Sequence, residues 1–131
     1  MKTIDALWIL SKDGIPIADF CRDTNINKSL LSSAISAIRT FANTISGKEL
    51  KSFQTGNSQF SCTKCLNDTA ILVLKVSKET KHKEIEKICK ILKKIFEDLY
   101  NPEDIKGWDG DLSFFDKFKQ KLDLYFRVSN L

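Results

Sequence analysis

The stretch Ile-Asp-Ala-Leu-Trp-Ile-Leu-Ser-Lys-Asp-Gly-Ile-Pro-Ile-Ala-Asp-Phe-Cys, residues 4–21, predicts the first hairpin of a sheet. Its first part, Ile4–Leu10, is an almost unbroken apolar run, typical of a strand covered on both faces. Asp13-Gly14 favours the positive φ angles of a tight turn, and a second strand is expected over Ile15–Cys21. Because Pro16 cannot donate a backbone hydrogen bond, this second strand belongs at an edge of the sheet.

Along the rest of the chain, the spacing of apolar residues switches between that of a helix and that of a strand. A first helix is expected from Asn25 or Asn27 to Ile45, because apolar residues recur there at i, i+3, i+4 and i+7. Three strands are then predicted, separated by the turn signals Gly56-Asn57 and Asn67-Asp68. Two helices follow. These five later elements are expected over Glu49–Thr55, Gln59–Lys64, Thr69–Val76, Lys81–Tyr100 and Ser113–Phe126.

The last helix has a predicted start and a predicted buried side. Asn101-Pro102 ends the helix before it, and Trp108-Asp109-Gly110 lies in the connecting loop. Ser113 and Asp116 resemble a capping pair. Side chains at helical spacing are expected to face the core, namely Phe114, Phe118, Leu122 and Tyr125.

The two most apolar strands decide the arrangement of the sheet. The fifth strand, like the first, is an unbroken apolar run, so we expect the two to be central neighbours in an antiparallel sheet of order 2-1-5-4-3. A sheet with two such strands needs a layer on each face. The first helix is expected on one face and the two later helices on the other. The predicted fold is thus an α+β, three-layer α/β/α domain of order β-β-α-β-β-β-α-α over residues 1–131.

Composition limits the class of protein. The 131 residues carry 21 basic and 17 acidic side chains, and no apolar run reaches the roughly 18 residues of a transmembrane helix. The first residues lack the apolar stretch of a signal peptide. We therefore expect a cytoplasmic protein whose four Cys are thiols.

Patterns that mark catalytic or cofactor sites are missing from the sequence. The five Gly form neither a Walker-type nor a dinucleotide-binding run. Cys62-Thr-Lys-Cys65 lacks the second ligand pair of a zinc site, so incidental thiols are favoured and a metal or redox role stays open as the minor alternative. His82, the only His, has no Asp or Ser placed for a triad. We predict no catalytic residue, no cofactor and no metal.

One helix carries a row of lysines, called the lysine stripe below. Lys83, Lys87, Lys90 and Lys94 are spaced i, i+4, i+7 and i+11 and so share one face. Such a stripe suits anionic lipid head groups or nucleic acid. A solvated face opposite the core gives the same pattern and is favoured. Nucleic acid is disfavoured further because the aromatic residues lie on the apolar side and not among the lysines.

The order of elements and three segments resemble the longin-like domain of the longin and roadblock superfamily. The segments are Leu7–Pro16, Ile45–Lys51 and Trp108–Ser113. The likeness points to stand-alone archaeal longin-like proteins. The chain differs from SNARE-type longins because no coiled coil or anchor follows residue 126, and from the roadblock type because it starts with a strand.

The resemblance implies a non-enzymatic scaffold. Longin and roadblock domains act as platforms for small Ras-like GTPases, in membrane-trafficking complexes among others, and as dimers. The implied partners are a small GTPase, a second copy or another longin or roadblock domain, and a membrane through peripheral contact. We expect self-association through the edge of the third strand and the Asn27–Ile45 helix beside it. The strand residues concerned are Glu49, Lys51, Ser52, Phe53 and Thr55.

Two other classes of function stay open. Related profilin-like and sensor folds bind small molecules, so a ligand-binding sensor is one alternative, which a buried polar cavity would favour. An anionic lipid or nucleic-acid surface bound through the lysine stripe is the other, and strongly salt-dependent binding would favour it.

Overall fold

A computed structural model of the protein describes residues 4–21, 35, 37 and 52–129. The first helix predicted up to Ile45 lies outside these residues except for Ile35 and Ala37, which are both helical. The described elements are β1 Ile4–Ser11, β2 Pro16–Cys21, β3 Ser52–Thr55, β4 Ser58–Cys65, β5 Ala70–Ser77, α2 His82–Leu99, α3 Pro102–Lys106, the 3-10 helix η1 Leu112–Phe115 and α4 Asp116–Ser129.

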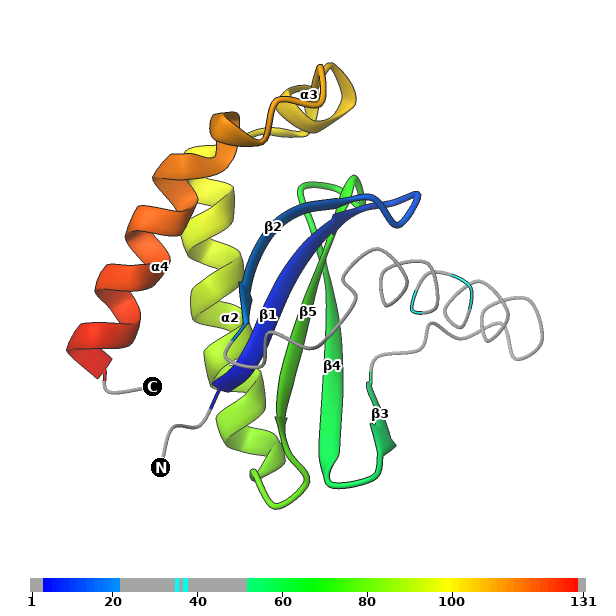
Figure 1. Ribbon diagram of the computed structural model, residues 1–131, viewed down its shortest axis with the longest axis vertical. Helices are drawn as coiled ribbons and strands as arrows, with labels where there is room; N and C mark the ends of the chain where they lie inside the picture. Colours follow the sequence, from blue (N-terminus) through cyan, green and yellow to red (C-terminus); the bar gives the residue numbers. More distant parts are fainter. Residues whose placement is uncertain (1–3, 22–34, 36, 38–51, 130–131) are drawn as a thin grey trace.

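The five strands form one antiparallel sheet in the order β2-β1-β5-β4-β3 (Figure 1), which confirms the predicted order. The two apolar strands, β1 and β5, are the central neighbours. β2 is an edge strand that begins at Pro16, and a register shift between Ile9 and Leu10 lies opposite this proline. β3 forms the other edge.

Side chains along the central strands alternate between two separate cores. Leu7 and Ile9 belong to the core beneath α2 and α4, whereas Trp8 and Leu10 belong to the core on the opposite face. This alternation follows from the two-residue period of a strand and explains the unbroken apolar runs. Ile35, from the predicted first helix, is buried in the second core. The structure thus places Ile35 and α2 on opposite faces of the sheet, as predicted.

Helix α2 covers the sheet through an apolar stripe. Its buried side chains recur at helical spacing and include Ile85, Ile88, Leu92 and Phe96. Lys81 provides no side-chain cap at its start, and the backbone turns extended at Tyr100. α2 and α4 lie side by side in the same layer (Figure 1). In the part of the chain that the structure describes, no helix is both long enough and apolar enough to span a bilayer.

A short helix, α3, follows α2 where the sequence pattern predicts only a loop. Asn101-Pro102 ends α2, as predicted, but it also starts α3. The Asn101 side chain accepts a hydrogen bond from the Asp104 backbone N–H at 3.0 Å, and the Asp104 carboxylate accepts one from the Asn101 N–H at 2.9 Å. This is a capping box with proline in the first turn. A pair of signals that stops one helix can therefore begin the next.

The predicted start of the last helix was wrong in its details. A turn of 3-10 helix precedes α4, and its cap is Asp111, whose carboxylate accepts hydrogen bonds from the Ser113 N–H at 3.0 Å and the Ser113 hydroxyl at 2.8 Å. Phe114 is 44% exposed, whereas Phe115 is buried. A 3-10 helix has three residues per turn, fewer than an α-helix. Treating residues 113–126 as one continuous α-helix therefore assigns Phe114 to the core in place of Phe115.

Candidate functional site

The predicted interaction strand lies at the open edge of the sheet. Within the described residues, β3 pairs with β4 and with no other strand. Ser52, Phe53 and Thr55 lie in β3, whereas Glu49 and Lys51 lie outside the described residues. Ser52 is exposed and Phe53 is half-buried. The edge thus offers backbone groups together with polar side chains.

Phe53 packs against the core that contains Trp8 and is not fully exposed on the surface. Its ring stacks on Phe60 of β4 with centroids 4.9 Å apart and planes at 6°. Phe60 in turn stacks on Trp8, at 6.5 Å and 21°. This row of rings joins the edge strand to the centre of the sheet. A substitution at Phe53 therefore perturbs the fold as well as the edge.

Gln54 is an edge residue in the middle of β3 that the sequence pattern does not mark. It is exposed, and it pairs with Gln59 across the hairpin. The turn between the strands has two residues, starting with Gly56 at φ +57°. The pair that flanks such a turn is hydrogen-bonded and alternate pairs are not. Counting back along β3, this geometry directs the backbone N–H groups of Gln54 and Ser52 away from β4.

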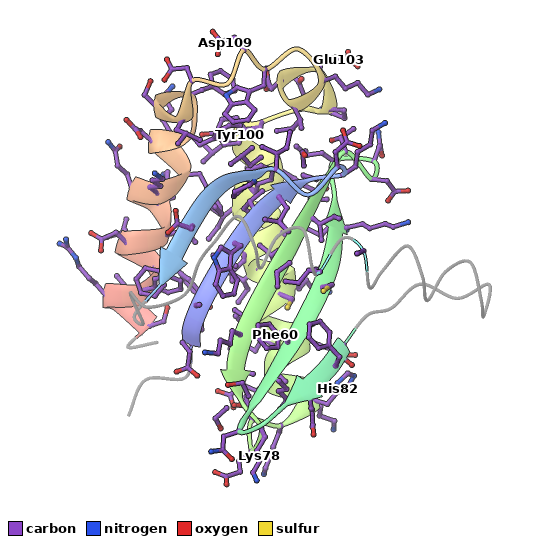
Figure 2. All side chains as sticks on the ribbon, turned by 45° about the vertical axis from the view of Figure 1, so that its right-hand side comes forward. Phe60, Lys78, His82, Tyr100, Glu103 and Asp109 are labelled. Atoms are coloured by element: carbon purple, nitrogen blue, oxygen red, sulfur yellow. The ribbon has the colours of Figure 1, made fainter. Side chains whose placement is uncertain are left out.

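A groove of about 300 Å³ runs between β4 and α2 beside this edge. On its inner side the Cys89 thiol lies 3.7 Å from the Ser61 hydroxyl, and burial raises the pKa of this thiol. Figure 2 shows His82 at the end of the molecule where β3 lies. The groove is open to solvent. It is therefore not the buried polar cavity that would favour the hypothesis of a small-molecule sensor. Its rim carries His82 and three charged side chains, namely Glu86, Lys90 and Lys93.

His82 is a surface residue. Its Nε2 lies 2.8 Å from the Glu86 carboxylate, one helical turn on, and both side chains are mostly exposed. Exposed i, i+4 pairs of this kind contribute little to helix stability. Nothing in this arrangement orients the imidazole toward a nucleophile.

The Cys-x-x-Cys pair is divided between the two faces of the sheet. Cys62 belongs to the core that contains Trp8, and Cys65 to the core beneath α2. Residues three apart on a strand point to opposite faces, so one ion cannot reach both thiolates without a change of backbone. Within the described residues, no group of three or more His, Cys, Asp or Glu could hold a metal ion. That these thiols bind no structural metal stays a prediction.

Cys65 is expected to make stability fall with rising pH above about 9. Burial, and next the Glu97 carboxylate, raise the pKa of its thiol from 9.0 to about 12. Between these two values the unfolded chain loses the proton and the folded chain keeps it, so unfolding is favoured as the pH rises. Urea midpoints measured from about pH 8 to about pH 11 should therefore fall more steeply for the unmodified chain than for Cys65→Ala. Parallel curves would exclude this effect.

The lysine stripe is exposed along its whole length. Lys83, Lys87, Lys90 and Lys94 lie on the side of α2 opposite its buried residues. Lys94 forms an ion pair with Asp98 at 3.1 Å. Binding of an anionic partner by the stripe stays a prediction.

Comparisons with known proteins find likeness of fold and not of sequence. Neither a protein-family model nor a curated protein sequence matches the chain. Myxococcus xanthus MglB is 21% identical over 72% of this chain and 85% of its own, with a TM-score of 0.54. A Roadblock/LC7 domain from Streptomyces avermitilis is 11% identical over 62% of this chain and 72% of its own, with a TM-score of 0.50. A structure described as MglB with a tetrameric arrangement is 11% identical over 68% and 72%, with a TM-score of 0.54. The chain therefore has the longin/roadblock fold.

Proposed function

We propose that this protein is a dimeric scaffold that binds a small Ras-like GTPase and does not hydrolyse nucleotide by itself. The observation that carries the proposal is the likeness over most of the domain to MglB and Roadblock/LC7 structures. That likeness agrees with the resemblance implied by Leu7–Pro16 and Trp108–Ser113. Domains of the longin and roadblock superfamily act as platforms for small GTPases, so a small GTPase is the partner with the best support.

The β3 edge supports self-association. Its outward N–H and C=O groups have the geometry that pairs with another strand, and Ser52 and Gln54 beside them are exposed. A second copy in antiparallel register would continue the sheet across the interface. The tetrameric arrangement described for one MglB structure is consistent with assembly through this fold.

The opposite edge is less suited to assembly. β2 begins with a proline, and η1 and α4 pack against it. The rings of Phe20 in β2 and Phe126 in α4 are 4.6 Å apart. A proline on an edge strand hinders pairing with another chain. Self-association is therefore proposed at the β3 edge and not at the β2 edge.

Nucleotide chemistry is assigned to the partner and not to this chain. The sequence has no glycine-rich phosphate loop, which nucleotide hydrolases of the P-loop class require. The one histidine is exposed and paired with Glu86. We therefore propose that any effect on hydrolysis arises by binding to the GTPase.

A binding screen tests the function. The purified chain, immobilised, is exposed in turn to each small Ras-like GTPase of its source organism, loaded with GDP or with a non-hydrolysable GTP analogue. We expect at least one GTPase to be retained, and one nucleotide state to be retained more than the other. The second nucleotide state of the same GTPase is the matched control. Failure to retain any of them in either state would overturn the proposal.

A further inference from the structure

We propose that the outer face of α2 and α4 is a docking surface for an anionic lipid bilayer. This inference is independent of the proposed GTPase partner, and it uses a face of the molecule other than the β3 edge. Three observations support it: a second exposed stripe on α4, a groove between α2 and α4 that both helices line, and the positive charge of the face that the two stripes form.

Helix α4 carries a stripe with the same spacing as the lysine stripe. Lys117, Lys121, Leu124 and Val128 are spaced i, i+4, i+7 and i+11, and all four are exposed. Leu124 is 57% exposed and Val128 is 79% exposed. They lie to one side of the buried stripe of this helix, which is formed by Phe118, Leu122 and Phe126. The core does not explain why two aliphatic side chains project from this face.

The two stripes lie on the same outer side of the helical layer. A groove of about 330 Å³ separates the helices, with Lys87 and Ile91 on the α2 wall and Tyr125 and Ser129 on the α4 wall. Tyr125 thus marks the side of α4 that faces α2. Lys121 and Val128 come next around the helix towards solvent. Figure 1 shows α2 and α4 adjacent, with the sheet to one side of them.

The combined face is strongly basic. It carries the lysine stripe together with Lys117 and Lys121. Its acidic groups are Glu84, which lines the groove, Asp98, which pairs with Lys94, and Glu86, which lies one turn before Lys90. Asp123 pairs with Arg127 further around α4. Six lysines set against three carboxylates leave an excess of positive charge, which complements the anionic lipids of a membrane surface.

Aliphatic side chains among the lysines favour a bilayer over nucleic acid. Leucine and valine can enter the boundary between head groups and acyl chains while lysines remain at the phosphates. Single-stranded nucleic acid would instead need exposed aromatic rings for base stacking. Tyr125, the aromatic residue on this groove, is half-buried. Each lysine near such a membrane contributes about 1 kcal/mol, or roughly fivefold in partitioning.

Vesicle flotation tests the assignment. The full chain is mixed at low salt with vesicles of phosphatidylcholine and phosphatidylserine, and with vesicles of phosphatidylcholine alone. We expect flotation with the anionic vesicles, lost as salt rises. Combined Lys83→Gln, Lys87→Gln and Lys90→Gln should weaken partitioning about 100-fold. Combined Leu124→Ser and Val128→Ser should weaken it too, while leaving the salt dependence in place.

A matched triple variant separates a site from net charge. Lys12, Lys78 and Lys106 are exposed lysines outside the two stripes. Their combined Lys→Gln variant has the same total charge as the stripe variant and should float like the unmodified chain. No flotation with anionic vesicles at low salt would overturn the proposal. An equal loss in both triple variants, or tighter binding to a single-stranded oligonucleotide than to the vesicles, would overturn it as well.

Discussion

We expect Phe96→Ala to lower the free energy of unfolding by about 3–5 kcal/mol, among the largest single-residue effects on the described core. The Phe96 side chain is fully buried on α2. Its ring centroid lies 5.1 Å from that of Tyr100, 6.3 Å from Phe115 and 5.0 Å from Phe118. It thereby joins α2 to η1 and α4. Alanine would leave a cavity between three elements that cannot all close on it.

Urea unfolding, followed by far-ultraviolet circular dichroism, measures this loss. Phe114→Ala is the control, because it makes the same chemical change at a ring that is 44% exposed. We expect it to cost about 1 kcal/mol or less, since most of that ring remains in water when the chain is folded. Equal losses in the two variants would mean that the packing of α2 on α4 is not as described.

Gln54→Pro should convert a dimer of this chain into monomers. The proline removes a backbone N–H that points away from β4, and its ring blocks the approach of a second strand at the middle of β3. Each backbone hydrogen bond lost across the interface leaves an acceptor unpaired at a cost of about 1–3 kcal/mol. A total loss of about 3 kcal/mol corresponds to roughly 100-fold in the dimer dissociation constant. Pairing within the hairpin does not use this N–H, so the monomer should stay folded.

Sedimentation equilibrium over a range of concentrations gives the dissociation constant. Gln54→Thr is the matched control, because it keeps the N–H and suits a strand. Phe53→Pro is the second comparison. It removes an N–H directed at β4 and disturbs the stack with Phe60, so it should lower the melting temperature as well. A chain that is monomeric at high concentration, or a Gln54→Thr variant that dissociates equally, would refute the β3 interface.

Much of the fold could be predicted because local pattern and tertiary position agree in it. The apolar runs of β1 and β5 place both strands in the centre of the sheet, and Pro16 places β2 at its edge. The prediction failed at two places, where one residue ends a helix and caps the next, and where a 3-10 turn interrupts the helical period. Asn101 ends α2 and caps α3. The 3-10 turn before α4 changes the period of the apolar stripe, so Phe115 rather than Phe114 is buried.

The candidate site could be predicted in location but not in detail. An edge strand was expected at β3, yet the side of the hairpin on which the Gln54 N–H lies depends on the length of the turn that follows. The groove between β4 and α2 joins residues more than twenty positions apart, such as Ser61 and Cys89. The face formed by Lys87 and Val128 likewise exists only after α2 and α4 pack side by side. No single stretch of sequence carries these features.

Titration of one small Ras-like GTPase in its two nucleotide states tests the central claim most directly. The GTPase retained in the binding screen is labelled and titrated with this chain by fluorescence anisotropy, once with GDP and once with the GTP analogue. We predict saturable binding in which one state binds at least about tenfold more tightly, a difference of about 1.4 kcal/mol. The absence of saturable binding for every small GTPase of the source organism, in both states, would contradict a GTPase-binding scaffold.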